Sequence, residues 1–165
     1  MDATIRIPSL VEKLQKSGMK ACALTDHGNM YGAMKFKSAM EDAGLKPILG
    51  CEVYISPRGM EHKEHGIDNK YNHLILLAKN LIGYKNLIKI VSIASMDGFY
   101  YKPRIDFETL SKYSEGLIAT SACLAGTISK TLLESNYEKA LGEAKRYSEL
   151  FKGRFYVEIQ RNGME

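Results

Sequence analysis

The sequence predicts an α/β fold built from one sheet and its covering helices, and three observations support this prediction. Short apolar runs rich in Ile, Leu and Val alternate along the chain with segments of helical period. The first apolar run stops at Asp26-His27-Gly28 and a helical pattern follows, as at the functional ends of strands in α/β proteins. The chain has 165 residues, of which 45% are hydrophobic and 25% charged, as in a globular domain with a substantial core. We therefore expect one domain with a layered or barrel α/β architecture.

The first third of the chain carries two predicted helices, each followed by a strand. Pro8 suits an early helical position, and Leu10 and Leu14 keep the helical period up to Gly18. A second helical pattern stops at Gly44, a residue type that favours helix ends. We predict helices over residues 8–18 and 30–43, and strands over residues 20–25 and 47–56.

The middle of the chain begins with a polar loop over residues 57–70, rich in Gly, His, Lys and Glu. We expect this loop to fold the chain back, so that His73 lies beside Glu52. A buried strand over 73–78 and a strong helix over 80–96 follow. The run 99–104 combines aromatic and basic residues, and we predict that it forms a loop.

The last third of the chain is marked by two helix-capping residues. Asp106 should cap a short helix through Leu110, and Asn136 a longer helix up to Phe151. We also predict strands over 116–121 and 154–160, and a helix over 126–134. The chain opens almost directly into a helix and closes just after a strand, so we expect it to be a piece of a longer protein.

Charge and cysteine content narrow the functional classes only slightly. A net charge of +4 permits a nucleic-acid or phosphate partner without requiring one. Cys22, Cys51 and Cys123 are odd in number and form no Cys-x-x-Cys pair, which favours reduced intracellular thiols. The sequence shows neither an apolar run of membrane-spanning length nor a signal peptide, so we expect a cytoplasmic protein without a membrane partner.

Metal-competent side chains stand at the edges of several predicted strands, namely Asp26, His27, Glu52, His73 and Cys123. Imidazole, carboxylate and thiolate groups together are typical of zinc sites or, with less sulfur, of manganese and iron sites. Each residue also has a simpler interpretation. Asp26 could cap a helix or form an Asx turn, and Glu52 could pair with a lysine. His73 could be a satisfied core histidine, and Cys123 a small buried hydrophobe.

Six sequence runs resemble one family, the polymerase and histidinol phosphatase (PHP) domain at the amino terminus of bacterial replicative DNA polymerase III alpha subunits. They are 23–29 (ALTDHGN), 46–54 (KPILGCEVY), 73–74 (HL), 83–87 (GYKNL), 98–106 (GFYYKPRID) and 121–126 (SACLAG). The resemblance extends over essentially the whole chain. The run 98–106 points to the polymerase branch of the family rather than the phosphatase branch.

The resemblance implies a distorted (β/α)7 barrel of the PHP type that holds up to three metal ions, zinc or manganese, at its strand ends. By position, Glu52 is similar to the carboxylate that bridges two of these metals. His73 and Cys123 resemble the other ligands of one of them. His27 resembles a ligand of the third metal, and Asp2 falls where the family places an aspartate of that same site.

The family also implies a chemistry. Members with a full set of ligands are associated with a metal-dependent 3′→5′ exonuclease, a hydrolytic activity in which metals activate water. On this basis Glu52 and Asp26 are candidates for catalysis. Lys102 and Arg104 are candidates for binding phosphate or DNA, and their alternative is a solvated loop or a contact with another polymerase domain.

The chain departs from the family pattern at both ends. The opening His-x-His motif and the closing Asp-x-His motif are absent, so we expect residues 1–165 to be part of a single PHP domain, incomplete at both ends. The carboxylates and magnesium of nucleotidyl transfer would lie outside this chain. The expected partners are DNA, the remaining polymerase domains and other replicase subunits. The alternatives are a free-standing PHP phosphoesterase of the histidinol phosphatase kind and a non-catalytic structural domain.

Overall fold

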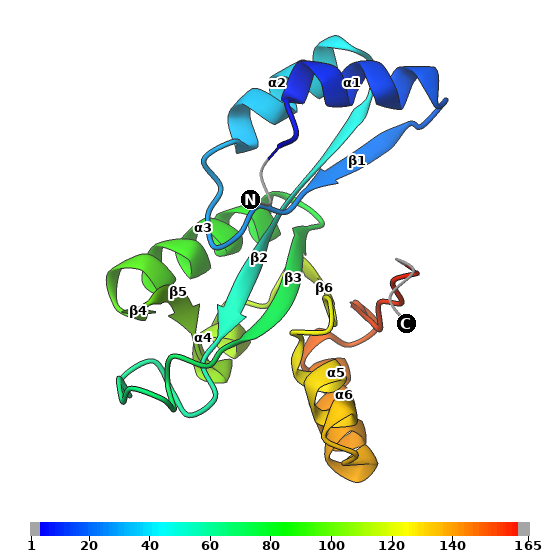
Figure 1. Cartoon of the computed structure of the whole chain (residues 1–165). Coiled ribbons are helices and arrows are strands. Elements are labelled where there is room, and N and C mark those ends of the chain that lie inside the picture. Colours follow the sequence, from blue (N-terminus) through cyan, green and yellow to red (C-terminus); the bar gives the residue numbers. More distant parts are fainter. Residues whose placement is uncertain (1–3, 162–165) are drawn as a thin grey trace.

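The long strand β2 (Lys46–Ile55) is the central strand of a mixed sheet in the computed structural model, which describes residues 4–161 (Figure 1). One edge of β2 pairs in parallel with β1 (Ala21–Leu24) and then with β5 (Lys102–Ile105), while its other edge pairs with β3 (Asn72–Ala78) in antiparallel. The remaining strands are β4 (Phe99–Tyr100), β6 (Leu117–Thr120) and β7 (Phe155–Tyr156). The order across the sheet is β4-β5-β2-β3-β6-β7, with β1 beside β2.

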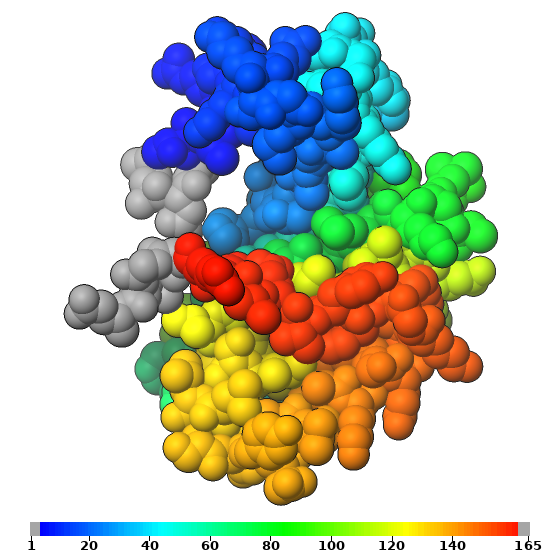
Figure 2. All heavy atoms as spheres, turned by 90° about the vertical axis from the view of Figure 1, so that its right-hand side faces the viewer, coloured from blue at the N-terminus to red at the C-terminus, as the bar shows by residue number. Residues whose placement is uncertain are grey.

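The helices form groups along the sheet. The first pair, α1 (Ile7–Lys16) and α2 (Ala33–Asp42), packs beside β1 and the first half of β2, and α3 (Leu81–Met96) crosses the middle (Figure 1). The short α4 (Phe107–Lys112) follows β5, and α5 (Thr127–Leu133) and α6 (Tyr137–Phe151) lie together at the far end. After α6 the chain runs across the face shown in Figure 2, between the N-terminal helices and α5. Within residues 4–161, no helix combines the length and apolarity needed to cross a bilayer.

The main core lies on one face of the sheet, so the side chains in the second half of β2 point alternately toward the core and away from it. Cys51, Val53 and Ile55 point into a buried apolar cluster that also contains residues of α3, α6, β3 and β6. Because side chains alternate along a strand, Glu52 and Tyr54 point to the opposite face. The sequence therefore directs a carboxylate away from the core in the middle of its most buried strand.

The α/β fold class is confirmed, and so are the helix starts predicted at Asn80, Asp106 and Asn136. Asn80 accepts a hydrogen bond from the Gly83 amide at 2.9 Å. Asp106 accepts one from the Thr109 amide at 2.8 Å, and Asn136 accepts one from the Lys139 amide at 3.0 Å. These side chains satisfy backbone donors that the first helical turn leaves without a partner.

Two local predictions are wrong. The run 99–104 is not a loop, because Phe99 pairs with Pro103 and Tyr100 with Lys102 in the hairpin of β4 and β5. The hairpin turns at Tyr101, whose φ of 60° lies in the left-handed region. The last strand is also shorter than residues 154–160, since only Phe155–Tyr156 pairs with β6.

The strands do not alternate with helices throughout, because the chain passes from β2 to β3 through the loop 56–71 alone. Arg58 binds this loop together from within: its Nε donates to Asp68 Oδ1 at 2.9 Å, and its Nη2 donates to Asp68 Oδ2 at 2.5 Å and Glu64 Oε2 at 3.0 Å. The Glu64 amide also donates to Asp68 Oδ2 at 2.8 Å. The loop is thus a fixed connection that reverses the chain, as the sequence predicts for residues 57–70.

Asp68→Asn should lower the free energy of unfolding at neutral pH, and this difference from the wild type should vanish in acid. Hydrogen bonds from Arg58 lower the pKa of Asp68 to about 2, whereas an unfolded aspartate has a pKa of about 3.9. The charged form of Asp68 therefore stabilises the fold fully above about pH 4, and this contribution disappears as the pH falls through about 2. Urea unfolding of both proteins at pH 7 and near pH 2 checks this. An equal difference at both pH values would contradict it.

Candidate metal centre

Three metal-competent side chains meet on the face of the sheet that points away from the α3 core. The ligand atoms of Glu52, His73 and Cys123 all lie within 4.8 Å of one another. Glu52 Oε1 is 3.2 Å from His73 Nδ1, and Cys123 Sγ is 3.5 Å from the same nitrogen. Glu52 is 7% exposed, whereas His73 and Cys123 are half-buried, so the cluster has one protected side and one accessible side.

The antiparallel register of β2 and β3 brings His73 beside Glu52. Tyr54 pairs with His73 and Glu52 pairs with Ile75, so Glu52 and His73 are diagonal neighbours on one face. This arrangement explains how a histidine at the beginning of its strand can reach a carboxylate in the middle of another. As expected from the sequence, the loop between the two strands folds the chain back to produce it.

A tight turn after β6 places Cys123. Ala122 adopts a left-handed φ of 58°, which is uncommon for a residue with a Cβ and redirects the chain directly before the cysteine. The His73 amide then donates to Ala125 O at 3.0 Å, and the Ala125 amide donates to Cys123 Sγ at 3.4 Å. A Cβ on Gly126 would lie 2.1 Å from Ser121 O, so this turn requires glycine there. The backbone thus fixes the sulfur against β3.

His27 approaches the same carboxylate from β1. The Gly28 amide donates to Glu52 O at 2.8 Å and the Glu52 amide donates to Asp26 O at 3.0 Å, which extends the parallel pairing of β1 and β2. His27 Nδ1 lies 2.6 Å from Glu52 Oε1, and half of its side chain is exposed. Gly28 has a φ of +68°, and a Cβ there would lie 2.7 Å from Pro103. The glycine of Asp26-His27-Gly28 therefore lets the chain leave β1 close to β5.

The charge on Glu52 is stabilised by the two imidazoles. Burial is the largest single influence on this carboxyl group and opposes its ionisation, but hydrogen bonds and charge interactions with His73 and His27 together outweigh it. The net result is a pKa of Glu52 below its ordinary value. The pairing of Glu52 with a lysine, an alternative that the sequence leaves open, is not found: its side-chain partners within residues 4–161 are histidines.

The three side chains fit a divalent metal ion. Ligand atoms bonded to zinc at about 2.0–2.3 Å in a tetrahedron lie roughly 3.3–3.7 Å apart. The separations of 3.2 Å and 3.5 Å measured from His73 Nδ1 are close to this edge length, and all three ligand atoms lie within 4.8 Å of one another. Three protein ligands with an accessible side are typical of catalytic zinc sites, which keep one position for water or substrate.

The predicted role of Arg104 is wrong, because its side chain is 0% exposed. Its guanidinium donates to four backbone carbonyls: Gly98 O at 3.1 Å, Asp68 O at 2.8 Å, Met60 O at 3.1 Å and His62 O at 3.1 Å. Three of these bonds hold the loop 56–71 against β5, and the fourth binds Gly98, which directly precedes β4. Arg104 therefore cannot receive a phosphate from solvent.

The other predicted site residues lie at different distances from the cluster. Lys102 is exposed, with its Nζ 5.8 Å from the centre of the Tyr54 ring, so its phosphate-binding role stays a prediction. Asp26 contributes its backbone carbonyl to the Glu52 amide, while its carboxylate faces Gly32 at the start of α2. Asp2 lies outside the described residues.

The three cysteines differ clearly in their surroundings, and the structure describes all of them as free thiols. Cys51 is fully buried in the core, where burial raises the pKa of its thiol to about 12. Cys22 is half-buried in β1, and Cys123 alone of the three belongs to the metal-competent cluster.

Sequence reasoning missed two residues beside the cluster, Tyr71 and Lys130. The Tyr71 ring lies nearly parallel to the His73 ring, with centroids 6.0 Å apart, and contacts Tyr54 at 4.7 Å. Its position two residues before His73 is a usable signal, because such residues share a face of a strand. No such signal exists for Lys130, which reaches the site from α5.

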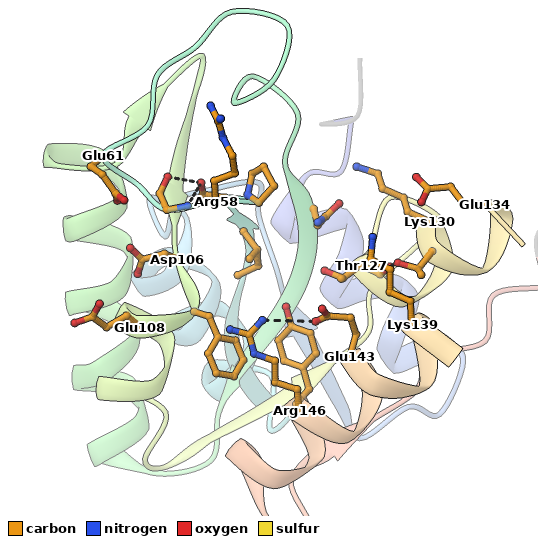
Figure 3. Close-up of a pocket in the computed structure, with 18 residues that line it drawn as sticks. Arg58, Glu61, Asp106, Glu108, Thr127, Lys130, Glu134, Lys139, Glu143 and Arg146 are labelled. Carbon is orange, nitrogen blue, oxygen red and sulfur yellow. Dashed lines mark hydrogen bonds and ion pairs between the residues drawn. The ribbon is translucent and has the colours of Figure 1, made fainter. Parts of the chain in front are cut away.

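Two open cavities adjoin this region. One, of about 440 Å³, lies between the end of β2, α4 and the helices α5 and α6, and charged residues of both signs line it (Figure 3). The other, of about 540 Å³, lies beside His73. Lys130 of α5 and Glu134, which directly follows this helix, line both cavities.

Comparisons with known proteins agree with the geometry. A family model of the PHP domain matches residues 1–162. A DNA polymerase III subunit alpha from Borreliella burgdorferi is 45% identical over 166 residues, covering 100% of this chain and 14% of the relative. The protein of the same name from Treponema pallidum is 41% identical, again over 100% of this chain and 14% of the relative. The chain thus spans about one seventh of the length of these curated relatives.

A solved structure of a proposed metal-dependent phosphoesterase from Bifidobacterium adolescentis is a more distant match. It has a TM-score of 0.39 and 20% identity, over 56% of this chain and 29% of the other. A likeness this loose informs neither the fold nor the site.

Proposed function

The chain belongs to the PHP domain family, and from this premise we propose that Glu52, His73 and Cys123 hold a divalent metal at a phosphoesterase site. The observation that carries the proposal is the convergence of an imidazole, a carboxylate and a thiol within 4.8 Å. Three strands and turns far apart in the sequence supply these groups. With a sulfur ligand present, zinc is the metal that the site favours, and manganese is the alternative.

The chain's own residues would prepare the site for hydrolysis. A divalent ion bound here would lower the pKa of a water molecule and stabilise negative charge on the scissile phosphate. Glu52 keeps its charge although it is buried, because His27 and His73 contact the same oxygen at 2.6 Å and 3.2 Å. Tyr71 and Tyr54 pack around the His73 ring and restrict its orientation.

We propose that Glu52 serves two metal ions rather than one. Its Oε1 lies 2.6 Å from Nδ1 of the half-exposed His27 and 3.2 Å from Nδ1 of His73, which belongs to the cluster with Cys123. We assign His27 to a second metal position that shares Glu52, together with Asp2, which is outside the described residues. Asp26 is proposed to act in catalysis from the adjacent turn.

We propose that this chain is part of a bacterial DNA polymerase III alpha subunit, since the relatives that match along its whole length carry that name. Its PHP site would act as a 3′→5′ exonuclease on DNA. The nucleotidyl transfer site, with its magnesium, would lie outside this chain. Its partners would be DNA, the other polymerase domains and further replicase subunits, all in the cytoplasm. The mixed sheet would be an arc of the distorted (β/α)7 barrel, completed by residues outside 1–165.

A nuclease assay on the full-length protein tests this function. With manganese or zinc, a 5′-labelled single-stranded oligonucleotide should be shortened from its 3′ end, and a chelator should stop the reaction. Cys123→Ser should lower the rate at least about tenfold, since loss of one ligand weakens metal binding. Cys22→Ser, the matched control in β1, should not change it. Degradation that persists in chelator, or that Cys123→Ser leaves at the wild-type rate, would refute the assignment.

A further inference from the structure

The cavity of about 540 Å³ beside His73 has the size of a small-molecule subsite. One wall is the end of the loop 56–71 together with Tyr71 and His73, and the opposite wall is Ala125 and α5. Because His73 belongs to both the cavity and the metal-competent cluster, a molecule in this cavity would adjoin the reacting centre.

Lys130 gives the cavity a positive end. Its Nζ donates to Tyr71 O at 2.6 Å, which uses one of its three N–H donors and holds the ammonium beside the residue that precedes β3. Burial lowers the pKa of Lys130, although charge interactions with Cys123 and Glu134 act in the opposite direction. The lining contains a second cation, Lys70, and one carboxylate, the exposed Glu134. Two cations against one carboxylate give the cavity an excess of positive charge, which favours an anion.

The loop wall of the cavity is suited to a flat polar group. Within residues 4–161, the buried side-chain oxygen that has no hydrogen-bond partner is Oδ1 of Asn69, a residue of this cavity wall. A buried acceptor without a donor is costly, so a ligand that carries an N–H group would be favoured beside it. The half-buried Tyr71 supplies an aromatic surface in the same wall.

We propose that this cavity is a nucleotide subsite, in which Lys130 binds the phosphate and Asn69 and Tyr71 contact the base of a DNA strand. A nucleotide combines the required groups, an anionic phosphate and a planar base with N–H donors, about one sugar apart. The inference rests on the proposed phosphoesterase function and names the substrate unit that this site would hold. Lys130 is here a substrate-binding residue and not a metal ligand.

Nuclear magnetic resonance of the 165-residue chain tests the proposal, with the side-chain amide of Asn69 as reporter. Deoxythymidine monophosphate, deoxythymidine and inorganic phosphate are titrated separately, each with and without zinc. Deoxythymidine monophosphate should bind most tightly and should shift the Asn69 signal. Lys130→Gln should weaken its binding about tenfold, the effect of losing one hydrogen bond to a charged group, and should leave deoxythymidine binding unchanged.

Two further variants keep the test decisive. Lys139→Gln removes the same charge from the neighbouring cavity of about 440 Å³ and should leave nucleotide affinity within about twofold. Lys130→Arg keeps the charge and should retain most of the affinity. If Lys130→Gln does not fold, two wild-type measurements still show whether the cavity binds a nucleotide. They are the shift of the Asn69 signal and the preference for the monophosphate over deoxythymidine.

The outcomes separate this inference from the metal site. Zinc titration of Lys130→Gln should match that of the wild type. If the wild type binds zinc but the monophosphate leaves Asn69 unshifted, or if Lys139→Gln has the larger effect, the subsite is refuted while the metal site stands. If zinc does not bind, the metal proposal fails, and the titrations without zinc still decide whether the cavity takes the nucleotide.

Discussion

Glu52→Gln should abolish tight zinc binding by this chain and, in the full-length protein, its metal-dependent exonuclease activity. The substitution nearly preserves shape but removes the negative charge that lies 2.6 Å from His27 and 3.2 Å from His73. Metal affinity should fall by at least about 100-fold, since even residues that only orient a ligand contribute 10–100-fold. On the proposed function, polymerisation would use carboxylates outside this chain, so its rate per folded molecule should change much less.

Metal analysis, nuclease rate, polymerase rate and melting temperature on one preparation check this expectation. Glu61→Gln is the matched control, because Glu61 is an exposed glutamate with a histidine neighbour, His62, at 3.1 Å. It should leave zinc binding unchanged. A folded Glu52→Gln variant that keeps full exonuclease activity would remove the catalytic assignment, and equal losses of stability and of both activities would indicate a structural role.

Arg104→Met should lower the free energy of unfolding by about 3–5 kcal/mol, the range for disrupting a buried charged network. The substitution keeps much of the side-chain volume but leaves four carbonyls without their donor, those of Met60, His62, Asp68 and Gly98. The carbonyls of Met60, His62 and Asp68 belong to the loop that leads into β3. Zinc affinity should therefore fall as well, because the loop sets the position of His73.

Urea unfolding of Arg104→Met and Lys102→Met measures the effect. Lys102 is the control because it occupies the same strand, β5, with an exposed side chain, and its loss should cost less than about 1 kcal/mol. An Arg104→Met protein as stable as Lys102→Met would show that the buried guanidinium does not hold the loop. In that case the loop would depend on its other contacts, such as those between Arg58 and Asp68.

The candidate metal centre was largely predictable because its residues stand where apolar runs end or are interrupted. A carboxylate inside an apolar strand, as at Glu52, needs a partner, and few side chains other than metal ligands or cations can supply one. The sequence predicted that His73 lies beside Glu52, but it could not show that His27 contacts the same oxygen, because that contact depends on the parallel pairing of β1 and β2. Apolar periodicity indicates that a strand is buried but not the direction in which it runs.

The role of Arg104 could not be predicted, because a buried arginine looks like a surface arginine in the sequence. Its acceptors are backbone carbonyls 6–44 residues away, and carbonyls carry no sequence signal. The hairpin of β4 and β5 was missed for a related reason. Pro103 argues against a strand in general, yet it is tolerated here in a short strand near the edge of the sheet.

Titration of the chain with Co²⁺, followed by absorption spectroscopy, tests the central claim that Glu52, His73 and Cys123 bind one metal ion. A bound thiolate produces a sulfur-to-cobalt charge-transfer band. We predict that this band saturates in the wild type at one equivalent of Co²⁺ per chain. The band should disappear in Cys123→Ser and persist in Cys22→Ser. A band of full intensity in Cys123→Ser, or no band in the wild type, would contradict the metal centre described here.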